Sequence, residues 1–214
     1  MPPSGSMPAK PGVLRCAVLP VLAGLILCAV GAFFHQRYLA VNFGVVAPGA
    51  VYRSAQPSPE DLARFARERG LKSVLNLRDD TPDLILEAET RAAQRLGLSL
   101  FSVPLSARTP PTPTQLFQII HAIRNGPKPM LIHCRAGADR TGVVSVLAAM
   151  AIAGKPYQTA RKQLSVRHLR LLPANHGIGS LLTAFEHHAD QKGLENPSWP
   201  DFVEWAASHY ADKQ

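Results

Sequence analysis

Residues 129–142 read PMLIHCRAGADRTG, and this stretch decides the fold. Its first five residues form a short apolar run that is typical of a buried strand, and residues 141–153 are almost entirely apolar, which predicts a buried helix. A strand, a loop and a helix in this order form the repeating unit of α/β folds. Ligands of such folds bind beyond the carboxyl ends of the strands, so we expect the loop after His133 to line a binding crevice.

The same alternation extends on both sides of this stretch. Two more strands are predicted, over residues 72–78 and 98–105. Cap residues followed by proline mark helix starts, as in Ser58-Pro59 and Thr112-Pro113, and glycines mark helix ends. The predicted helices cover residues 58–70, 81–97, 112–126, 141–153, 156–168, 178–190 and 199–210. The pattern predicts an α/β fold with a central, mainly parallel sheet of about four to five strands, flanked by helices.

The chain has 214 residues, a length that suits one medium domain with an extension. We assign the globular domain to residues 51–214 and a linker or lead-in strand to residues 38–50. Residues 1–12 are rich in Pro, Ser and Gly and are predicted to be disordered.

Residues 13–37 are interpreted as one transmembrane anchor. Residues 16–34 within them carry no charged side chain and are rich in Leu, Val and Ala, and about 20 apolar residues span the hydrocarbon layer. Two alternatives stay open. One is a cleaved signal peptide with small residues at its processing site (Ala29, Gly31 and Ala32), and the other is a buried helix of a soluble protein.

The charges that flank this segment predict its orientation. Lys10, Arg15 and the amino terminus precede it, whereas Arg37 follows it. Positive charge favours the cytoplasmic side, so we expect a single-pass membrane protein whose globular domain is exported, into the periplasm if the source is bacterial.

The number of cysteines and the net charge limit the kinds of site and ligand that the domain can have. Of three cysteines only Cys134 lies in the predicted domain, so no disulfide framework can form there, and this thiol is either a buried filler or reactive. The net charge is +8, which suits acidic lipid headgroups, phosphorylated substrates or nucleic acid. The sequence has no zinc-ligand spacing and no basic tail interleaved with aromatic residues, so we expect no nucleic-acid partner.

The loop after His133 has the composition of an anion site. Successive backbone N–H groups between a strand and a helix form a nest for anions, and the helix N-terminus adds partial positive charge. The same environment lowers the pKa of a thiol, so we expect Cys134 to be a nucleophilic thiolate. Arg140 is spaced to bind two oxygens of a phosphate. The predicted substrate-binding residues are Arg135, Ala136, Gly137, Ala138 and Thr141, of which Thr141 could also donate to the thiolate.

The C-x5-R-T pattern from Cys134 to Thr141 resembles the signature of the cysteine-dependent protein tyrosine and dual-specificity phosphatase superfamily. VYRSAQP at 51–57 and KSVLNLR at 72–78 resemble the opening of its compact dual-specificity-like members, and the resemblance covers about residues 51–164. It implies a phosphatase-type fold and hydrolysis of phosphomonoesters through a cysteinyl-phosphate intermediate, with Cys134 and Arg140 catalytic and with no cofactor and no metal.

The general acid is less obvious. The resemblance suggests an Asp in a loop upstream of the cysteine, but no Asp or Glu occurs from Thr90 to Ala138. The loop is similar to that of a bacterial subgroup, H-C-x-x-G-K-D-R-T, whose Asp is thought to be the acid, and Ala138 replaces its Lys here. We therefore take Asp139 as the catalytic acid. The alternatives are Asp79, Asp80 and Asp83, for which helix capping is the other explanation.

The sequence leaves the substrate open. A phosphotyrosine protein is favoured, and a lipid or phosphoinositide phosphomonoester is the alternative, given the apolar segment and the basic charge. A phosphate-binding pseudophosphatase without turnover is the rival from another class. An arsenate-reducing protein would need further resolving cysteines in the domain, and the sequence has none there.

Overall fold

The computed structural model describes residues 13–34, 41–78, 84–168 and 176–210. The chain divides into two compact units, Met1–Ala40 and Val41–Gln214.

The described part of the first unit is the helix α1 (Val13–Phe34), with Pro20 inside it. No helix in the described part of the chain has both the length and the apolar character that a membrane crossing requires. The transmembrane anchor predicted over residues 13–37 is therefore not supported, and residues 35–37 lie outside the described ranges. The disordered tail predicted over residues 1–12 also lies outside them, and the predicted export of the domain stays a prediction.

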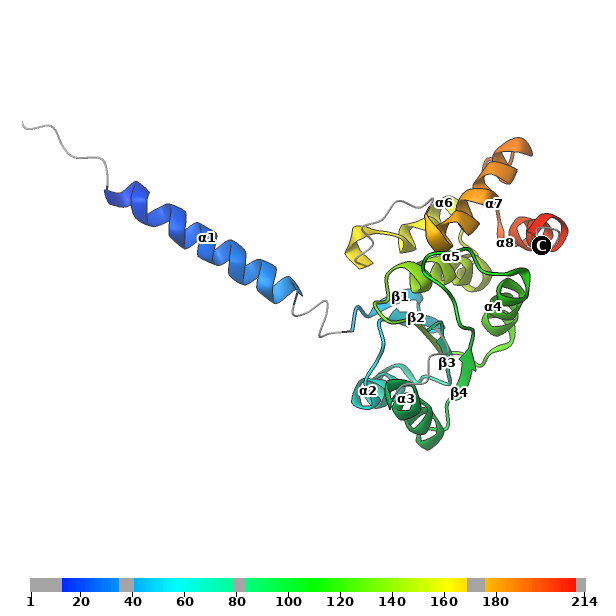
Figure 1. Cartoon of the computed structure of the whole chain (residues 1–214), viewed down its shortest axis with the longest axis horizontal. Helices are drawn as coiled ribbons and strands as arrows, with labels where there is room; N and C mark the ends of the chain where they lie inside the picture. The colour runs from blue at the N-terminus through cyan, green and yellow to red at the C-terminus, as the bar shows by residue number, and fades with distance from the viewer. Residues whose placement is uncertain (1–12, 35–40, 79–83, 169–175, 211–214) are drawn as a thin grey trace, which may run out of the picture. The chain divides into compact units, whose positions relative to one another are not determined.

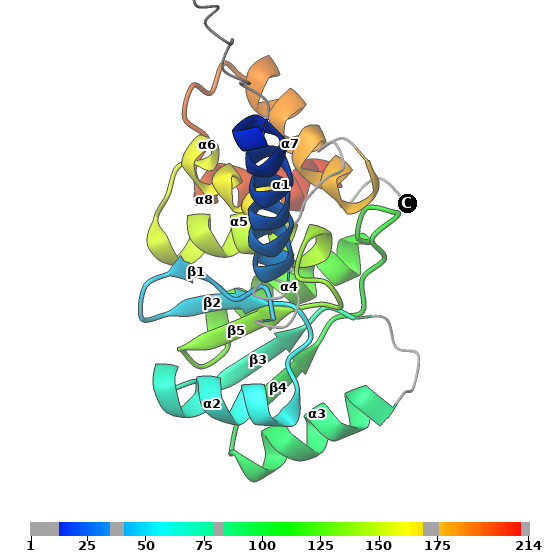
Figure 2. The same cartoon turned by 90° about the vertical axis from the view of Figure 1, so that its left-hand side faces the viewer.

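The second unit is built on one five-stranded sheet with the order β1-β2-β5-β3-β4 (Figures 1 and 2). Its strands are β1 (Gly44–Ala47), β2 (Val51–Ser54), β3 (Ser73–Asn76), β4 (Ser99–Ser102) and β5 (Met130–His133). Only β1 runs antiparallel to its neighbour, and the other pairs are parallel. The predicted mainly parallel sheet is confirmed. Strand β1 lies within residues 38–50, which the sequence assigned to a linker or lead-in strand.

Helices cover both faces of the sheet, as Figure 2 shows. Two lie on one face, α2 (Pro59–Arg69) and α3 (Leu84–Arg95). The other face carries α4 (Pro113–Asn125), α5 (Asp139–Ala153), α6 (Tyr157–Ala160), α7 (Ser180–Gln191) and α8 (Trp199–Trp205). The single helix predicted over 156–168 is wrong: after α6 the chain forms two short 3-10 turns. The carbonyl of Gln163 in the first turn accepts a hydrogen bond from Arg53 of strand β2, which links this turn to the sheet.

Local sequence signals explain the helix starts. Ser58 and Asp61 form a capping box at α2, and Thr112 and Gln115 form another at α4, each with proline in the first turn. Gly70 ends α2 in the left-handed conformation that glycine adopts without strain. The predicted cap-proline starts of these two helices are confirmed.

Two hydrophobic cores, one on each face, hold the sheet in place. Val74 and Leu131 belong to the core under α2 and α3, and Leu75 and Ile132 belong to the core under the other helices. Successive side chains of a strand point to opposite faces, so the two central residues of β3 and of β5, which are buried on both sides of the sheet, are apolar. Helix α5 is buried from Thr141 to Met150, as its unbroken apolar sequence predicts.

The C-terminal turn Ala206–Tyr210 is tied to the rest of the domain by a buried tyrosine. The Tyr210 hydroxyl donates to the carbonyl of Pro111 over 2.5 Å, and burial raises the pKa of Tyr210 to about 12. Because the phenol must be protonated to donate, its stabilising contribution is complete below pH 10 and is lost as the pH rises towards 12. We expect Tyr210→Phe to lower the free energy of unfolding by about 1 kcal/mol at pH 7.

Urea unfolding at pH 7 and at pH 11 checks this expectation. Wild type should lose more stability between the two pH values than Tyr210→Phe does. An equal loss in both proteins would show that the Tyr210 hydroxyl does not contribute.

Candidate active site

The three central strands end together at one edge of the sheet. Ser54 of β2 and Asn76 of β3 are both in register with His133 of β5, and the three strands are parallel. The segments that follow these residues therefore meet at the same edge, where the predicted loop begins at Cys134. This is the edge at which the sequence predicts a binding crevice, because ligands of α/β folds bind beyond the carboxyl ends of the strands.

The sulfur of Cys134 lies inside this loop and not at the surface. Cys134 is 2% exposed, and the backbone N–H of Gly137 donates to its Sγ over 3.3 Å. Gly137 has a φ of +70°, and a Cβ there would lie 2.6 Å from the backbone N of Ala55 and from the backbone O of Ser54. Only glycine satisfies both the conformation and this close approach.

Three successive carbonyl groups of the loop are held by donors from the segment 42–56. The carbonyl of Arg135 accepts from the Gln56 N–H over 3.2 Å. The carbonyl of Ala136 accepts from Asn42 Nδ2 over 3.1 Å, and that of Gly137 from the Arg53 guanidinium over 2.6 Å. In a trans peptide the N–H points away from the C=O, so holding the carbonyls on one side aims the N–H groups to the other. A row of N–H groups arranged in this way binds anions.

Arg140 lies in the first turn of α5, and its guanidinium is held at the same sheet edge. It donates to the carbonyl of Leu105 over 3.1 Å and to that of Leu77 over 3.5 Å, at residues that follow β4 and β3. Asp139, the first residue of α5, is half-buried beside it. The structure therefore brings Cys134, Asp139 and Arg140 together around one loop.

The other predicted site residues lie in the same loop with different exposure. Arg135 and Ala136 are exposed, Ala138 is buried at the N-cap of α5, and Thr141 is fully buried. Within the ranges that the structure covers, Thr141 Oγ1 has no hydrogen-bond partner, so the predicted bond from Thr141 to the sulfur is not formed. The alternative acids Asp79, Asp80 and Asp83 lie outside the described ranges.

A buried polar cluster beneath the loop was missed by the sequence analysis. His133 Nε2 lies 2.5 Å from Glu89 Oε1, and both side chains are almost fully buried. Asn76 Nδ2 donates to Glu89 Oε2 over 2.8 Å, and His133 Nδ1 lies 3.4 Å from the carbonyl of Cys134. The cluster links α3 to the residue that carries the sulfur. The only sequence signal was a carboxylate on the inner face of a predicted helix.

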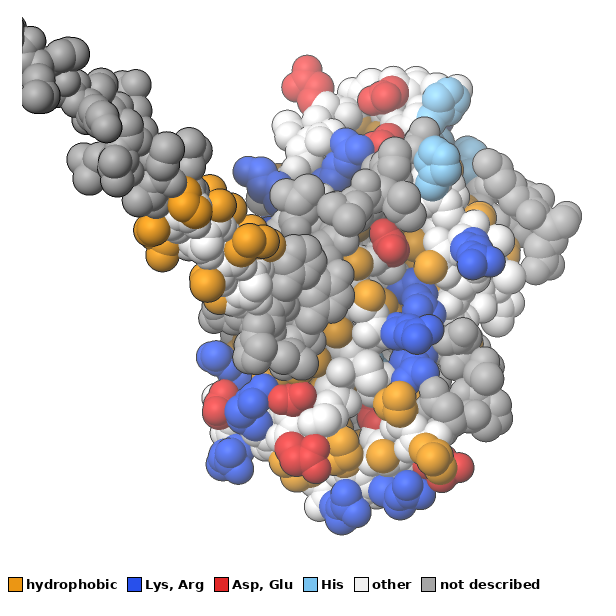
Figure 3. Space-filling model, turned by 60° about the vertical axis from the view of Figure 1, so that its left-hand side comes forward, with side chains coloured by type: hydrophobic (Ala, Val, Ile, Leu, Met, Phe, Trp, Pro, Cys, Tyr) orange, Lys and Arg blue, Asp and Glu red, His pale blue; other side chains and the backbone are white. Residues whose placement is uncertain are grey.

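Basic side chains gather on one face of the domain. Figure 3 shows a row of Lys and Arg side chains on one face of the second unit. Arg108 and Arg135 are both exposed. Exposed cations raise the local concentration of anionic ligands and the rate at which they arrive.

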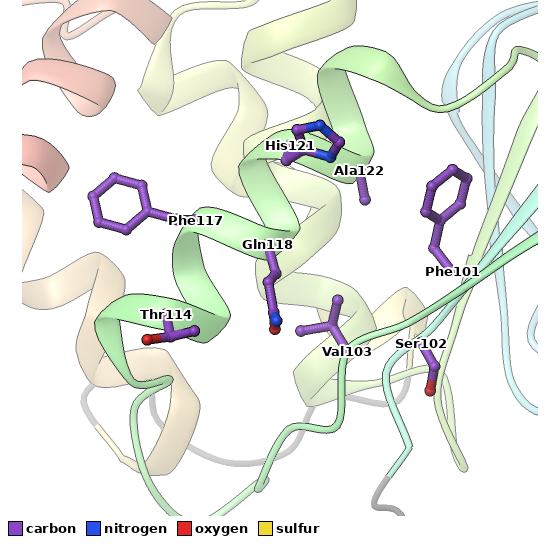
Figure 4. Close-up of a pocket in the computed structure, with 8 residues that line it drawn as sticks. All are labelled: Phe101, Ser102, Val103, Thr114, Phe117, Gln118, His121 and Ala122. Atoms are coloured by element: carbon purple, nitrogen blue, oxygen red, sulfur yellow. The ribbon is translucent and has the colours of Figure 1, made fainter.

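A cavity of about 640 Å³ lies elsewhere, between β4 and α4 (Figure 4). Phe101, Val103, Phe117 and His121 contribute to its wall, and no residue of the loop 134–140 does. The lining is mainly apolar and contains no Lys or Arg, so it does not suit a phosphate. The loop 134–140 is the better candidate for the active site.

A family model described as DSP-PTPase phosphatase fused to NAD+ kinase matches residues 45–170, more than half of the chain. The chain is also similar to a protein from Arabidopsis thaliana named inositol diphosphatase DSP3. The two are 32% identical over 108 residues, which cover 47% of this chain and 50% of that protein. The chain thus spans about half the length of the curated relative that it matches.

Among solved structures, the fold is similar to the core catalytic domain of the PP-IP phosphatase SIW14 from S. cerevisiae, solved in complex with citrate. The match has a TM-score of 0.55 and 19% identity, and it covers 73% of this chain and 96% of that one. At this level of identity the similarity shows a shared α/β phosphatase fold.

Gly137→Ala tests whether the close approach of the loop to Ser54 and Ala55 is required. The added Cβ would meet backbone atoms at 2.6 Å that cannot move aside, so the loop must shift and its N–H groups lose their aim. We expect hydrolysis of an aryl phosphate to fall by at least about 100-fold, as it does when oxyanion donors are removed.

Gly154→Ala is the matched control, since Gly154 has a φ of +59° at the end of α5 and nothing within 4 Å of an added Cβ. It imposes the same backbone strain without the clash and should lower the melting temperature with little change in kcat/KM. Equal losses of activity in the two variants would contradict the assignment of the loop.

Proposed function

We propose that this chain, which belongs to the family of DSP-PTPase phosphatases fused to NAD+ kinase, hydrolyses phosphomonoesters in two steps through a cysteinyl phosphate on Cys134. Its relatives are cysteine-dependent phosphatases, and the chain is an enzyme of that kind. One observation carries the proposed mechanism: the hydrogen bond from the Gly137 N–H to the buried Cys134 Sγ, within a loop whose carbonyls are held away from it. Donors that stabilise a thiolate in this way also fit a phosphate.

In the first step the Cys134 thiolate attacks phosphorus, and the bond from phosphorus to the ester oxygen breaks. The departing oxygen takes a proton from the Asp139 carboxyl group, so that an alcohol or phenol leaves. Arg140 binds two of the phosphoryl oxygens and stabilises the charge that they share in the transition state.

In the second step a water molecule attacks the phosphorus of the cysteinyl phosphate. Asp139, now a carboxylate, accepts a proton from this water, and the bond from sulfur to phosphorus breaks. Inorganic phosphate leaves and the thiolate is restored. The Thr141 hydroxyl, one residue after Arg140, is buried, and its oxygen has no partner in the described structure.

A phosphotyrosine-containing protein is the first substrate class that we propose. Cys134 is 2% exposed, so the phosphorus must reach a sulfur below the surface, and a long, flat phenol delivers it there more easily than a short seryl side chain. The exposed Arg135 at the loop would attract the phosphate group as it enters.

A phosphorylated inositol is the second candidate, and the name of the Arabidopsis relative favours it. The domain is basic, with Arg108 and Arg135 exposed, and such a surface suits a ligand with several phosphate groups. Ala138 occupies the place of the Lys in the similar bacterial loop, which removes one cation from the immediate site.

Cys134→Ser tests the nucleophile across substrate classes. We expect wild type to release phosphate from at least one of phosphotyrosine peptides, phosphoinositides, lipid phosphates and soluble inositol polyphosphates, and the variant to lose this activity by at least about 1000-fold. Release of phosphate is the measurement. Tight binding of phosphate without turnover by wild type on every substrate would instead support a phosphate-binding pseudophosphatase.

Asp139→Asn tests the general acid. An alkyl or phenyl phosphate has a poor leaving group that needs a proton, whereas a nitrophenolate leaves without one. We expect kcat to fall by about 100-fold on the poor leaving group and far less on nitrophenyl phosphate. Steady-state kinetics on the two substrates provide the comparison, and equal losses on both would exclude Asp139 as the acid.

A further inference from the structure

Asn42 lies at the start of the second unit, far in sequence from the loop that it contacts. Its side chain is 1% exposed, and Nδ2 donates both to the carbonyl of Ala136 over 3.1 Å and to that of His168 over 3.2 Å. Its Oδ1 faces His168 Nδ1 at 3.4 Å. Two carbonyl oxygens at the same end of the amide require the NH₂ group there, which fixes the orientation of the side chain.

The peptide group that Asn42 holds is the one that contacts the nucleophile. The carbonyl of Ala136 and the N–H of Gly137 belong to a single planar unit, and they point in opposite directions. Asn42 donates to the oxygen of this peptide unit. The N–H hydrogen of the same unit is directed at Cys134 Sγ, and the Gly137 nitrogen lies 3.3 Å from that sulfur. Fixing the oxygen therefore fixes the direction of the hydrogen bond to the sulfur. A donor on the carbonyl also polarises the N–H and strengthens that bond.

The backbone at this position is in a conformation that L-residues rarely adopt. Val41 has a φ of +64° and Asn42 a φ of +46°. Asn tolerates the left-handed region, but a β-branched residue there is strained. Such strain persists only where surrounding contacts impose it, and here the carbonyl of Val41 accepts from the Ala55 N–H over 2.7 Å. The turn aims the Asn42 side chain at the loop.

We propose that Asn42 is a positioning residue of the active site, which aligns the Ala136–Gly137 peptide so that its N–H bonds the Cys134 sulfur and the substrate phosphate. The proposal rests on the proposed function, because it assigns Cys134 as the nucleophile. Asn42 touches neither sulfur nor substrate and acts through one peptide group. Arg53 holds the next carbonyl of the loop, that of Gly137. Unlike Asn42, it also donates to the carbonyl of Gln163.

Asn42→Asp keeps the shape of the side chain and its tolerance of positive φ, but it places a carboxylate oxygen against two carbonyl oxygens. Asn42→Gly keeps the backbone conformation and removes both donors without that repulsion. We expect both variants to move the pH midpoint of Cys134 alkylation by iodoacetamide upward, by about one pH unit for Asn42→Asp and less for Asn42→Gly. The alkylation is followed at Cys134 by mass spectrometry in the full chain. The kcat/KM for an aryl phosphate should fall at least tenfold in Asn42→Asp.

Thr112→Ala is the stability control, because Thr112 caps α4 and has no contact with the loop among the hydrogen bonds of the described residues. It should lower the melting temperature and leave the alkylation midpoint unchanged, which separates positioning from general destabilisation. If Asn42→Asp fails to fold, the alkylation midpoint of Asn42→Gly alone tests the positioning role.

The alkylation profile needs no turnover, so it tests the inference separately from the proposed function. Absence of hydrolysis by wild type would overturn the function, while shifted midpoints in the Asn42 variants would still support the positioning role. Wild-type midpoints in both Asn42 variants would overturn the positioning role even in an active enzyme.

Discussion

The site depends on the direction of a few backbone N–H groups. A loop can bind an anion only if consecutive peptide units turn the same way, and each unit left alone would rotate to bond water. In this domain the carbonyls of Arg135, Ala136 and Gly137 each have a donor on the outer side, supplied by Gln56, Asn42 and Arg53. The N–H of Gly137 consequently faces the Cys134 sulfur.

The sheet provides the frame that makes these bonds possible. Strands β2 and β5 are parallel neighbours, so residues just after Ser54 and just after His133 emerge side by side. Gly137 approaches the backbone of Ser54 and Ala55 so closely that a Cβ would not fit. The buried contact between Glu89 and His133 links α3 to the end of β5, just before Cys134. The carbonyls of Leu77 and Leu105, which follow β3 and β4, hold Arg140 at the same edge.

Sequence patterns predicted the parts of this arrangement that are local. The alternating strands and helices, the cap-proline starts at Ser58 and Thr112 and the loop from Cys134 to Arg140 all depend on neighbouring residues. The donors could not be found in this way, because Asn42 and Arg53 lie 94 and 84 residues from the carbonyls that they bind. Glu89 was equally hidden, since a carboxylate on a helix is usually solvated and its partner His133 lies on another element. Residue spacing carries no information about such contacts.

The positions of these donors bear on where the functional domain begins. A domain that started at residue 51, as the sequence patterns indicated, would retain Arg53 and Gln56 but lose Asn42 and all of β1. The second compact unit begins at Val41, and its next residue, Asn42, donates to a carbonyl of the loop 134–140. Residues 41–47 therefore contribute to the site as well as to the sheet: they provide an edge strand, and the strained turn before that strand places one donor. A single buried side chain, that of Asn42, links this segment to the Ala136–Gly137 peptide.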